Sequence, residues 1–181
     1  MNNPYPGLRP FKYEESYLFF GRDGQSEDLL KKLNKSHFVG VVGTSGSGKS
    51  SLVRAGLLPL LNSGFMPNTG SDWRVAVFRP GDDPIHNLAH ALVQPGYSEE
   101  GQSDDPLKVG IAETILRRSA IGLPDYVSSE DFGEDENLLV VVDQFEELFR
   151  FERESGLDKP DEEAAAFVKL LLEAAKDKSG K

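Results

Sequence analysis

The most informative segment of the chain reads Gly43-Thr44-Ser45-Gly46-Ser47-Gly48-Lys49-Ser50, and it fits the pattern G-x-x-x-x-G-K-[ST]. Glycines let the backbone turn so tightly that successive N–H groups converge on one phosphate. A helix that begins at Lys49 adds the positive end of its dipole, and the Lys49 ammonium can reach the β- and γ-phosphates of a nucleotide. Because the Ser50 hydroxyl can ligate Mg²⁺, the segment predicts a phosphate-binding loop, to which we assign Ser51 as well.

The residues on either side of this loop have strand and helix patterns. Phe38-Val39-Gly40-Val41-Val42 is a short apolar run with β-branched residues, which predicts a buried parallel strand at 38–42. Residues 49–57 follow a helical pattern, and Pro59 is expected to break or restart that helix. An ordinary glycine- and serine-rich turn would not explain why a strand pattern precedes the loop and a helix pattern follows it. We therefore favour the phosphate-binding interpretation.

A second candidate site lies about a hundred residues further along the chain. A phosphate loop needs an acidic residue at the end of a neighbouring strand to help bind Mg²⁺. Residues 138–142 are an unbroken apolar run, and Asp143 follows at its end. Gln144 occupies the next position, where many ATPases with this loop have a glutamate. We choose Glu146 as the residue that polarises the attacking water, with Glu147 and Gln144 as alternatives. Both glutamates could equally be helix-terminal acids, which the helix dipole favours.

The remaining chain alternates between strand and helix patterns. A further strand is predicted at 73–78. Helices are predicted at 24–35 behind an Asp23 cap, 84–93 behind Asp83-Pro84, 106–119, 144–152 and 161–176, and loops at 95–105 and 122–137. Two helices have apolar stripes, consisting of Leu107, Ile111, Ile115 and Leu116 in one and Ala164, Phe167, Val168, Leu171, Leu172 and Ala175 in the other. The alternation predicts an α/β fold with a parallel sheet.

The N-terminal segment has a different character, because prolines prevent a helix at its start. We expect an extended arm whose aromatic residues pack on the domain, followed by a helical or turn segment at 14–20. Residues 1–23 are therefore predicted as an arm and 24–181 as the core domain.

Composition excludes several classes of protein. The chain has 181 residues, no cysteine and a net charge of −10, so disulfides, cysteine-bound metals and thiol catalysis are excluded. No apolar run reaches the roughly 18 residues of a membrane span, and the N-terminus has no secretion-signal pattern, so we expect a cytoplasmic protein. Residues 99–136 have 11 acidic and 3 basic residues, which argues against nucleic acid as a partner.

For the histidines His37, His86 and His90, polar surface positions are favoured over metal ligation, because no third ligand is evident.

Taken together, six motifs resemble the novel STAND NTPase group, signal-transduction ATPases with numerous domains that are related to AAA+ proteins. The motifs occur in this order: Tyr5-Pro6-Gly7-Leu8-Arg9-Pro10-Phe11, Phe19-Phe20-Gly21-Arg22, Gly43–Ser51, Arg54-Ala55-Gly56-Leu57-Leu58-Pro59, Arg79-Pro80-Gly81 and Val142-Asp143-Gln144-Phe145-Glu146-Glu147-Leu148-Phe149. The resemblance implies a P-loop NTPase three-layer sandwich. It also implies further strands, one of them between the Gly43 and Asp143 strands, and lid domains. We therefore expect this chain to be the N-terminal part of a longer protein.

The resemblance also implies a function. It implies an ATP-binding switch in which Phe20, Gly21 and Arg22 lie near the adenine, Gly43–Ser51 hold the phosphates of ATP or ADP, and Ser50 and Asp143 hold Mg²⁺. Hydrolysis through Lys49, Asp143 and Glu146 would reset the switch. Partners would be effector and sensor domains of the same chain, such as WD40 repeats, and a second copy on activation. GTP is disfavoured, because Asn34-Lys35-Ser36-His37 precedes the loop and lacks the required Asp. The alternatives are a nucleotide-binding scaffold with little turnover and, less favoured, a small-molecule kinase.

Overall fold

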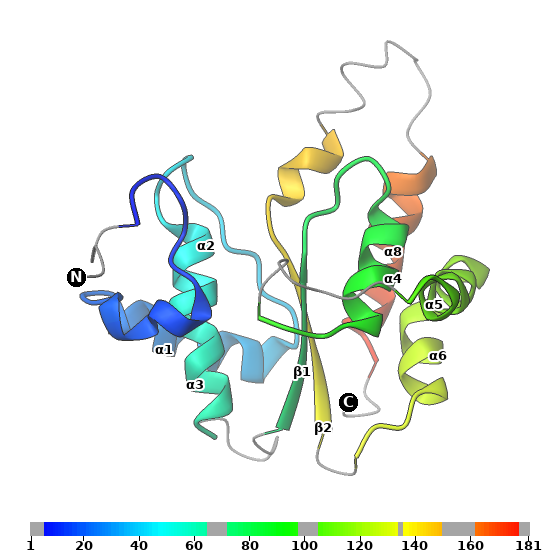
Figure 1. The fold of residues 1–181 in the computed structure, drawn as a ribbon, viewed down its shortest axis with the longest axis horizontal. Helices are drawn as coiled ribbons and strands as arrows, with labels where there is room; N and C mark the ends of the chain where they lie inside the picture. Colours follow the sequence, from blue (N-terminus) through cyan, green and yellow to red (C-terminus); the bar gives the residue numbers. More distant parts are fainter. Residues whose placement is uncertain (1–5, 65–71, 98–104, 134–135, 150–161, 178–181) are drawn as a thin grey trace. The chain divides into compact units, whose positions relative to one another are not determined.

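The computed structural model describes residues 6–64, 72–97, 105–133, 136–149 and 162–177. The chain divides into two compact units, Met1–Trp73 and Arg74–Lys181 (Figure 1). The first unit is helical where it is described. Its elements are the 3₁₀ helix η1 (Tyr13–Leu18), the helix α1 (Asp23–Ser36), and a continuous helical run made of α2 (Lys49–Ser51), the π-helical segment η2 (Leu52–Leu57) and α3 (Leu58–Asn62).

The helical run after the loop changes register before its proline. In an α-helix the ring of Pro59 would clash with the carbonyl of Ala55 and leave one carbonyl without a donor. The wider π-helical turns of η2 precede that point, and α3 begins at Leu58 with the proline in its first turn. The expectation that Pro59 restarts the helix is therefore confirmed.

The strand predicted at 38–42 is wrong. These residues are described, but they have no strand geometry, and the side chains of Phe38 and Val42 are 52% and 96% exposed. An extended segment becomes a strand only when a neighbour completes its ladder of hydrogen bonds. Among the described residues, the two strands pair with each other, so the apolar run remains an extended segment that leads into the loop.

The N-terminal arm packs on the first unit as expected. The Phe11 and Phe19 rings meet edge to face with their centroids 5.7 Å apart, and the Phe11 N–H donates to Ser51 Oγ at 3.1 Å. Leu8, Tyr17 and Phe20 do not follow this expectation, since their side chains are exposed. Helix α1 begins one residue earlier than predicted, because Arg22 rather than Asp23 is its N-cap residue.

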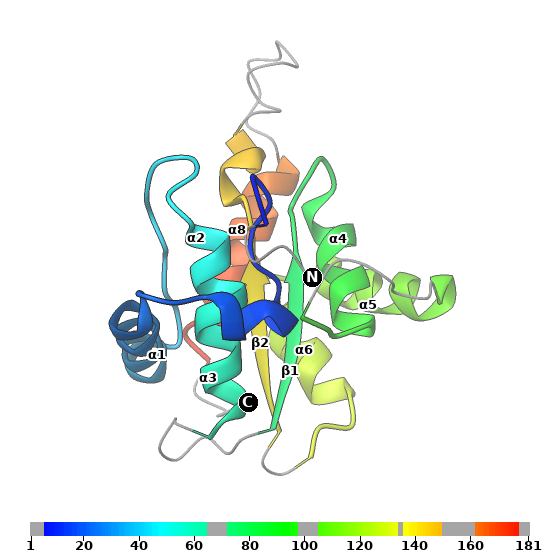
Figure 2. The same ribbon diagram turned by 60° about the vertical axis from the view of Figure 1, so that its left-hand side comes forward.

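The second unit contains the sheet. Strand β1 (Asp72–Phe78) pairs in parallel with β2 (Glu136–Val142), which confirms the strands predicted at 73–78 and 138–142 (Figure 2). Gly96 forms a further parallel bridge with Ala76, and its N–H donates to Val75 O at 2.7 Å. The parallel pairing of β1 with β2 supports an α/β fold with a small parallel sheet.

In the described part of this unit, several helical elements accompany the strands. They are α4 (Pro84–Val93), α5 (Pro106–Arg118), α6 (Gly122–Ser129), the 3₁₀ helix η3 (Phe145–Glu147) and α8 (Glu162–Ala174). The loop predicted at 122–137 is wrong over α6. This helix has poor helix formers, namely Gly122, Pro124 and two serines, so its sequence resembles a loop. Pro124 is tolerated because it lies in the first turn. The helix forms because Leu123 and Tyr126, one turn apart, are buried. The helix predicted at 144–152 begins with η3, and its end lies outside the described residues, as does most of the loop predicted at 95–105.

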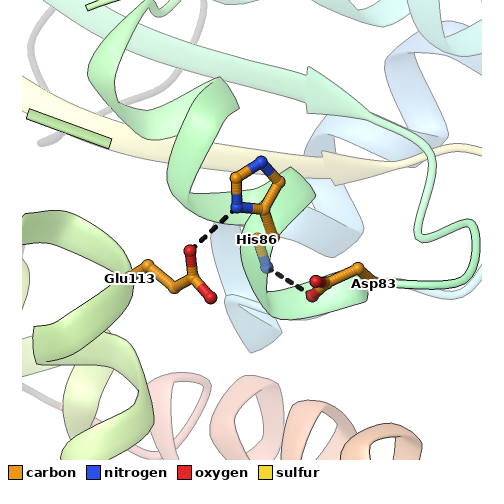
Figure 3. A group of neighbouring side chains, drawn as sticks. All are labelled: Asp83, His86 and Glu113. Carbon is orange, nitrogen blue, oxygen red and sulfur yellow. Dashed lines mark hydrogen bonds and ion pairs between the residues drawn. The ribbon is translucent and has the colours of Figure 1, made fainter. Parts of the chain in front are cut away.

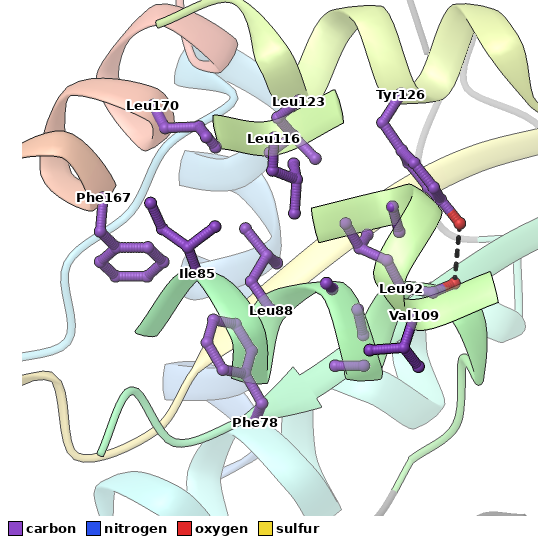
Figure 4. Close-up of a cluster of buried hydrophobic side chains, with 14 of the residues drawn as sticks. Phe78, Ile85, Leu88, Leu92, Val109, Leu116, Leu123, Tyr126, Phe167 and Leu170 are labelled. Atoms are coloured by element: carbon purple, nitrogen blue, oxygen red, sulfur yellow. Dashed lines mark hydrogen bonds between the residues drawn. The ribbon is translucent and has the colours of Figure 1, made fainter. Parts of the chain in front are cut away.

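The core of the second unit lies between β1 and the helices α4, α5, α6 and α8 (Figure 4). Phe78 and Phe167 meet edge to face at its centre, with ring centroids 6.0 Å apart. The two predicted stripes are correct in part: Leu116, Ala164 and Phe167 are buried, and Ile115, Val168 and Leu171 pack against the core, whereas Leu107, Ile111 and Leu172 do not. In α5 the buried residues are Val109, Ala112 and Leu116, while Leu107 and Ile111 are exposed, and in α8 they are Ala164, Phe167 and Leu170, while Leu172 is 47% exposed. No helix in the described part of the chain is long and apolar enough to cross a bilayer.

Candidate nucleotide-binding site

The predicted phosphate loop lies in the first unit as a tight turn in front of the helical run. Gly46 and Gly48 have φ angles of 73° and 83°, in the left-handed region that favours glycine. Gly43 is required for a different reason, because a Cβ atom there would lie 2.9 Å from Ser47 Oγ. The loop therefore needs glycine at positions 46 and 48 for its backbone conformation, and a side chain at position 43 would displace the Ser47 hydroxyl.

Lys49 closes the loop over its own backbone. Its Nζ donates to the carbonyl oxygens of Gly43 at 3.0 Å and Thr44 at 3.2 Å, and the Ser47 N–H donates to the Thr44 oxygen at 3.2 Å. These carbonyls hold the ammonium at the mouth of the turn, beside the N-terminal end of the helix. A phosphate that enters there would meet both the cation and the helix dipole.

The segment Phe20-Gly21-Arg22 reaches the same loop. Arg22 Nη1 donates to Ser47 O at 2.9 Å, and a Cβ on Gly48 would lie 3.4 Å from that nitrogen. Gly21 turns the chain with a φ angle of 81°, and the Phe20 ring next to it is 78% exposed. The geometry thus brings Arg22 to the phosphate loop and leaves the neighbouring aromatic ring open to solvent.

The two serines after Lys49 differ in their surroundings. Ser50 is half-buried, whereas Ser51 is buried and its Oγ accepts the Phe11 N–H. The Ser51 hydroxyl therefore fastens the N-terminal arm to the helix. Of the two, Ser50 is the better placed to offer its oxygen to a cation.

Asp143 belongs to the second unit and lies directly after β2. Its N–H donates to Phe78 O at 2.9 Å, so it lies at the edge of the sheet where both parallel strands end. Ligands of open α/β sheets bind at this edge. Asp143 Oδ1 also accepts the Gln144 N–H at 3.0 Å, which fixes the carboxylate against the turn that follows.

That turn has an unusual backbone. Gln144 has a φ angle of 55°, a left-handed conformation that is costly for a residue with a side chain. The chain then enters η3, where Glu147 N–H donates to Gln144 O at 2.9 Å. Glu146 is exposed and Glu147 is half-buried. The sequence pattern identifies Gln144 as a departure from the usual glutamate and as an alternative for positioning the water, but it does not predict the strained backbone.

A third group of polar residues, Asp83, His86 and Glu113, was missed by sequence reasoning (Figure 3). Asp83 caps α4 by accepting the His86 N–H at 3.1 Å, and His86 Nδ1 lies 2.8 Å from Glu113 Oε2. The hydrogen bond from His86, and then that from Arg117, lower the pKa of Glu113. The pairing of Glu113 with Arg117 at i,i+4 was the signal in the sequence.

The side chain of Arg117 explains this group without a metal. Its guanidinium contacts Glu113 Oε1 at 2.7 Å, Asp83 Oδ1 at 3.0 Å and Glu163 Oε2 at 2.6 Å. Those contacts raise the pKa of Arg117, with the hydrogen bond to Glu163 as the largest cause. One cation thus contacts all three carboxylates, and the group forms an ion-pair network that links α4, α5 and α8.

Comparison with known proteins identifies the family. The family model described as Novel STAND NTPase 1 matches residues 4–181, nearly the whole chain. No curated protein and no solved structure matches it. The match agrees with the resemblance drawn from the six motifs, and the chain therefore belongs to the Novel STAND NTPase 1 family.

Proposed function

We propose that this chain is the ATP-binding module of a regulatory switch, with Gly43–Ser51 as the phosphate site. The observation that carries the proposal is the loop itself: two glycines in the left-handed conformation, a lysine at its mouth and a helix that begins there. This combination binds phosphate through backbone N–H groups, one point charge and a helix dipole.

The residues present fit a magnesium nucleotide. Lys49 would exchange its two carbonyl contacts for phosphate oxygens, and Arg22 is a second cation next to the loop. Ser50 and Asp143 offer the hydroxyl and carboxylate oxygens that Mg²⁺ prefers. When bound, Mg²⁺ would neutralise phosphate charge. The exposed Phe20 ring supplies an apolar face for the adenine, in line with the role that the family resemblance implies.

For hydrolysis, we propose that Glu146 polarises the attacking water. It is the first carboxylate after the Asp143 turn, and the strained Gln144 backbone sets the direction in which η3 leaves the sheet. Hydrolysis would reset the switch in a longer cytoplasmic protein, whose effector and sensor domains, for example WD40 repeats, and a second copy on activation would be its partners. The second candidate is a scaffold with little turnover, which the exposed Glu146 and the missing glutamate at position 144 favour.

Calorimetric titration with ADP and ATP in the presence of Mg²⁺ tests binding. Lys49→Ala removes a charge-assisted contact worth about 1.5–3 kcal/mol, so the dissociation constant should rise about 10- to 150-fold. Lys32→Ala, on the exposed surface of α1, is the matched control and should bind like the wild type. If the Lys49→Ala variant and the wild type bind the nucleotide with equal affinity, the loop is not the phosphate site.

Steady-state phosphate release by the full-length protein separates the two candidates. Glu146→Gln should keep nucleotide affinity and lose about a hundred- to ten-thousand-fold in rate, the usual contribution of a group that activates water. Glu147→Gln is its neighbour in the same turn and should change the rate much less. If the wild type binds ATP and releases no phosphate, the scaffold function is correct. If Glu146→Gln hydrolyses ATP at the wild-type rate, Glu146 is only a helix-terminal acid.

A further inference from the structure

Residues 9–22, which we call the N-terminal strap, lie along the helical run that follows the phosphate loop. In the middle of that run, a Cβ on Gly56 would lie 3.3 Å from Phe19 Cε1, so the Phe19 ring packs directly on the helix backbone. At the far end of the run, Asn62 Nδ2 donates to the Tyr13 hydroxyl oxygen at 2.9 Å. The strap therefore contacts the helix well beyond the loop itself.

The strap also contacts the phosphate loop on both sides of Lys49. Before the lysine, Arg22 Nη1 donates to Ser47 O at 2.9 Å. After the lysine, the Phe11 N–H donates to Ser51 Oγ at 3.1 Å, and Ser51 is only 9% exposed. One segment of the chain thus holds two points of the loop that are four residues apart.

Contacts within the strap connect these two points. The Glu15 carboxylate accepts hydrogen bonds from the Arg9 guanidinium at 2.5 and 2.7 Å and from the Lys12 N–H at 3.0 Å. The Phe11 and Phe19 rings meet edge to face with their centroids 5.7 Å apart. Because these contacts join the first part of the strap to its last part, we expect its two contacts with the loop to form and break together.

We infer that the strap is a positioning element of the phosphate loop, and that nucleotide binding and docking of the strap stabilise each other. The inference rests on the proposed function, because it concerns how the phosphate site keeps its shape. A loop that is already held in its binding shape loses less conformational entropy when the ligand enters. Such coupling is reciprocal: the factor by which the strap raises nucleotide affinity is the factor by which bound nucleotide stabilises the docked strap. The strap therefore responds to occupancy of the site.

Calorimetric titration of this chain with ADP in the presence of Mg²⁺ gives the first test. Ser51→Ala removes the oxygen that accepts the Phe11 N–H, so the dissociation constant should rise about 2- to 12-fold, the equivalent of one hydrogen bond. Ser63→Ala is the matched control, because the Ser63 hydroxyl donates to Pro59 O at the far end of the same helical run. This control should bind ADP like the wild type.

A second variant leaves every residue of the loop unchanged. Phe11→Ala removes the edge-to-face contact with Phe19, so the dissociation constant for ADP should again rise about 2- to 12-fold. Tyr17→Ala is its matched control, since Tyr17 is an aromatic residue of the same strap that is 63% exposed. Its removal should leave the affinity for ADP unchanged.

Hydrogen exchange of the Phe11 amide, followed by NMR in the wild type, measures the coupling in the other direction and needs no variant. Saturating ADP and Mg²⁺ should slow this exchange by about the same 2- to 12-fold. The His37 N–H, which donates to Leu33 O at the end of α1, is the internal control and should exchange at the same rate with and without ADP. A strap that only stabilises the fold would leave the Phe11 exchange rate unchanged.

The outcomes separate this inference from the proposed function. If ADP binds, but both variants keep the wild-type affinity and the Phe11 exchange rate does not change, the coupling is overturned and the phosphate site remains. If the wild type binds no ADP, the proposed function itself fails, and the coupling fails with it.

Discussion

Gly56→Ala should destabilise the first unit, although alanine is the better helix former. Gly56 lies in η2 where this segment crosses α1. A Cβ there would fall well inside contact distance of Ser26 Oγ, and 3.3 Å from Phe19 Cε1 and Ser26 Cβ. Ser26 is only 3% exposed, so its side chain has little room to move away. The two helices would have to separate.

The magnitude follows from two opposing contributions. Overpacking a buried contact costs about 1–3 kcal/mol, and so close an approach points to the upper end. Replacing glycine by alanine in a helix returns about 1 kcal/mol. The net loss is about 2 kcal/mol, which lowers the melting temperature by roughly 4–8 °C in a chain of this size.

Thermal unfolding followed by circular dichroism measures this difference. Gly24→Ala in α1 is the matched control, because a Cβ at position 24 meets nothing within 4 Å, and it should stabilise by about 0.5–1 kcal/mol. The double variant with Ser26→Ala should recover part of the loss, since it removes the nearest atom. If Gly56→Ala is as stable as the wild type, the close crossing of α1 and η2 is refuted.

Two further predictions concern the core and the N-terminal arm. Phe167→Ala should cost about 3–5 kcal/mol in urea unfolding, because the ring is fully buried against Phe78, whereas Leu172→Ala should change stability by less than about 0.5 kcal/mol. The hydrogen bonds from Arg9 lower the pKa of Glu15 to about 2, so the Glu15 carboxylate adds stability above its ordinary pKa of 4.5 and loses it as the pH falls toward 2. In an Arg9→Met variant, the carboxyl resonance of Glu15 should titrate closer to 4.5 by NMR; an unchanged midpoint would exclude the ion pair as the cause.

Local sequence determined the features that depend on neighbours in the chain. Glycine spacing defined the loop at 43–50, and Asp83-Pro84 defined the start of α4. Valine-containing segments at 73–78 and 138–142 defined β1 and β2. These signals are local because turns, caps and strand propensity act over a few residues. The family itself followed from six short motifs.

Tertiary structure decided what depends on partners far along the chain. The apolar run at 38–42 is a strand only where another strand pairs with it, and α6 forms because Leu123 and Tyr126 reach the core despite poor helix propensity. The rotation of α5 was likewise decided by packing, which buries Val109 and Ala112 and turns Leu107 and Ile111 outward. A sequence pattern can show that a helix has apolar residues on two sides. Which side is buried depends on the neighbours that the fold supplies, because burial is a property of contacts rather than of residues.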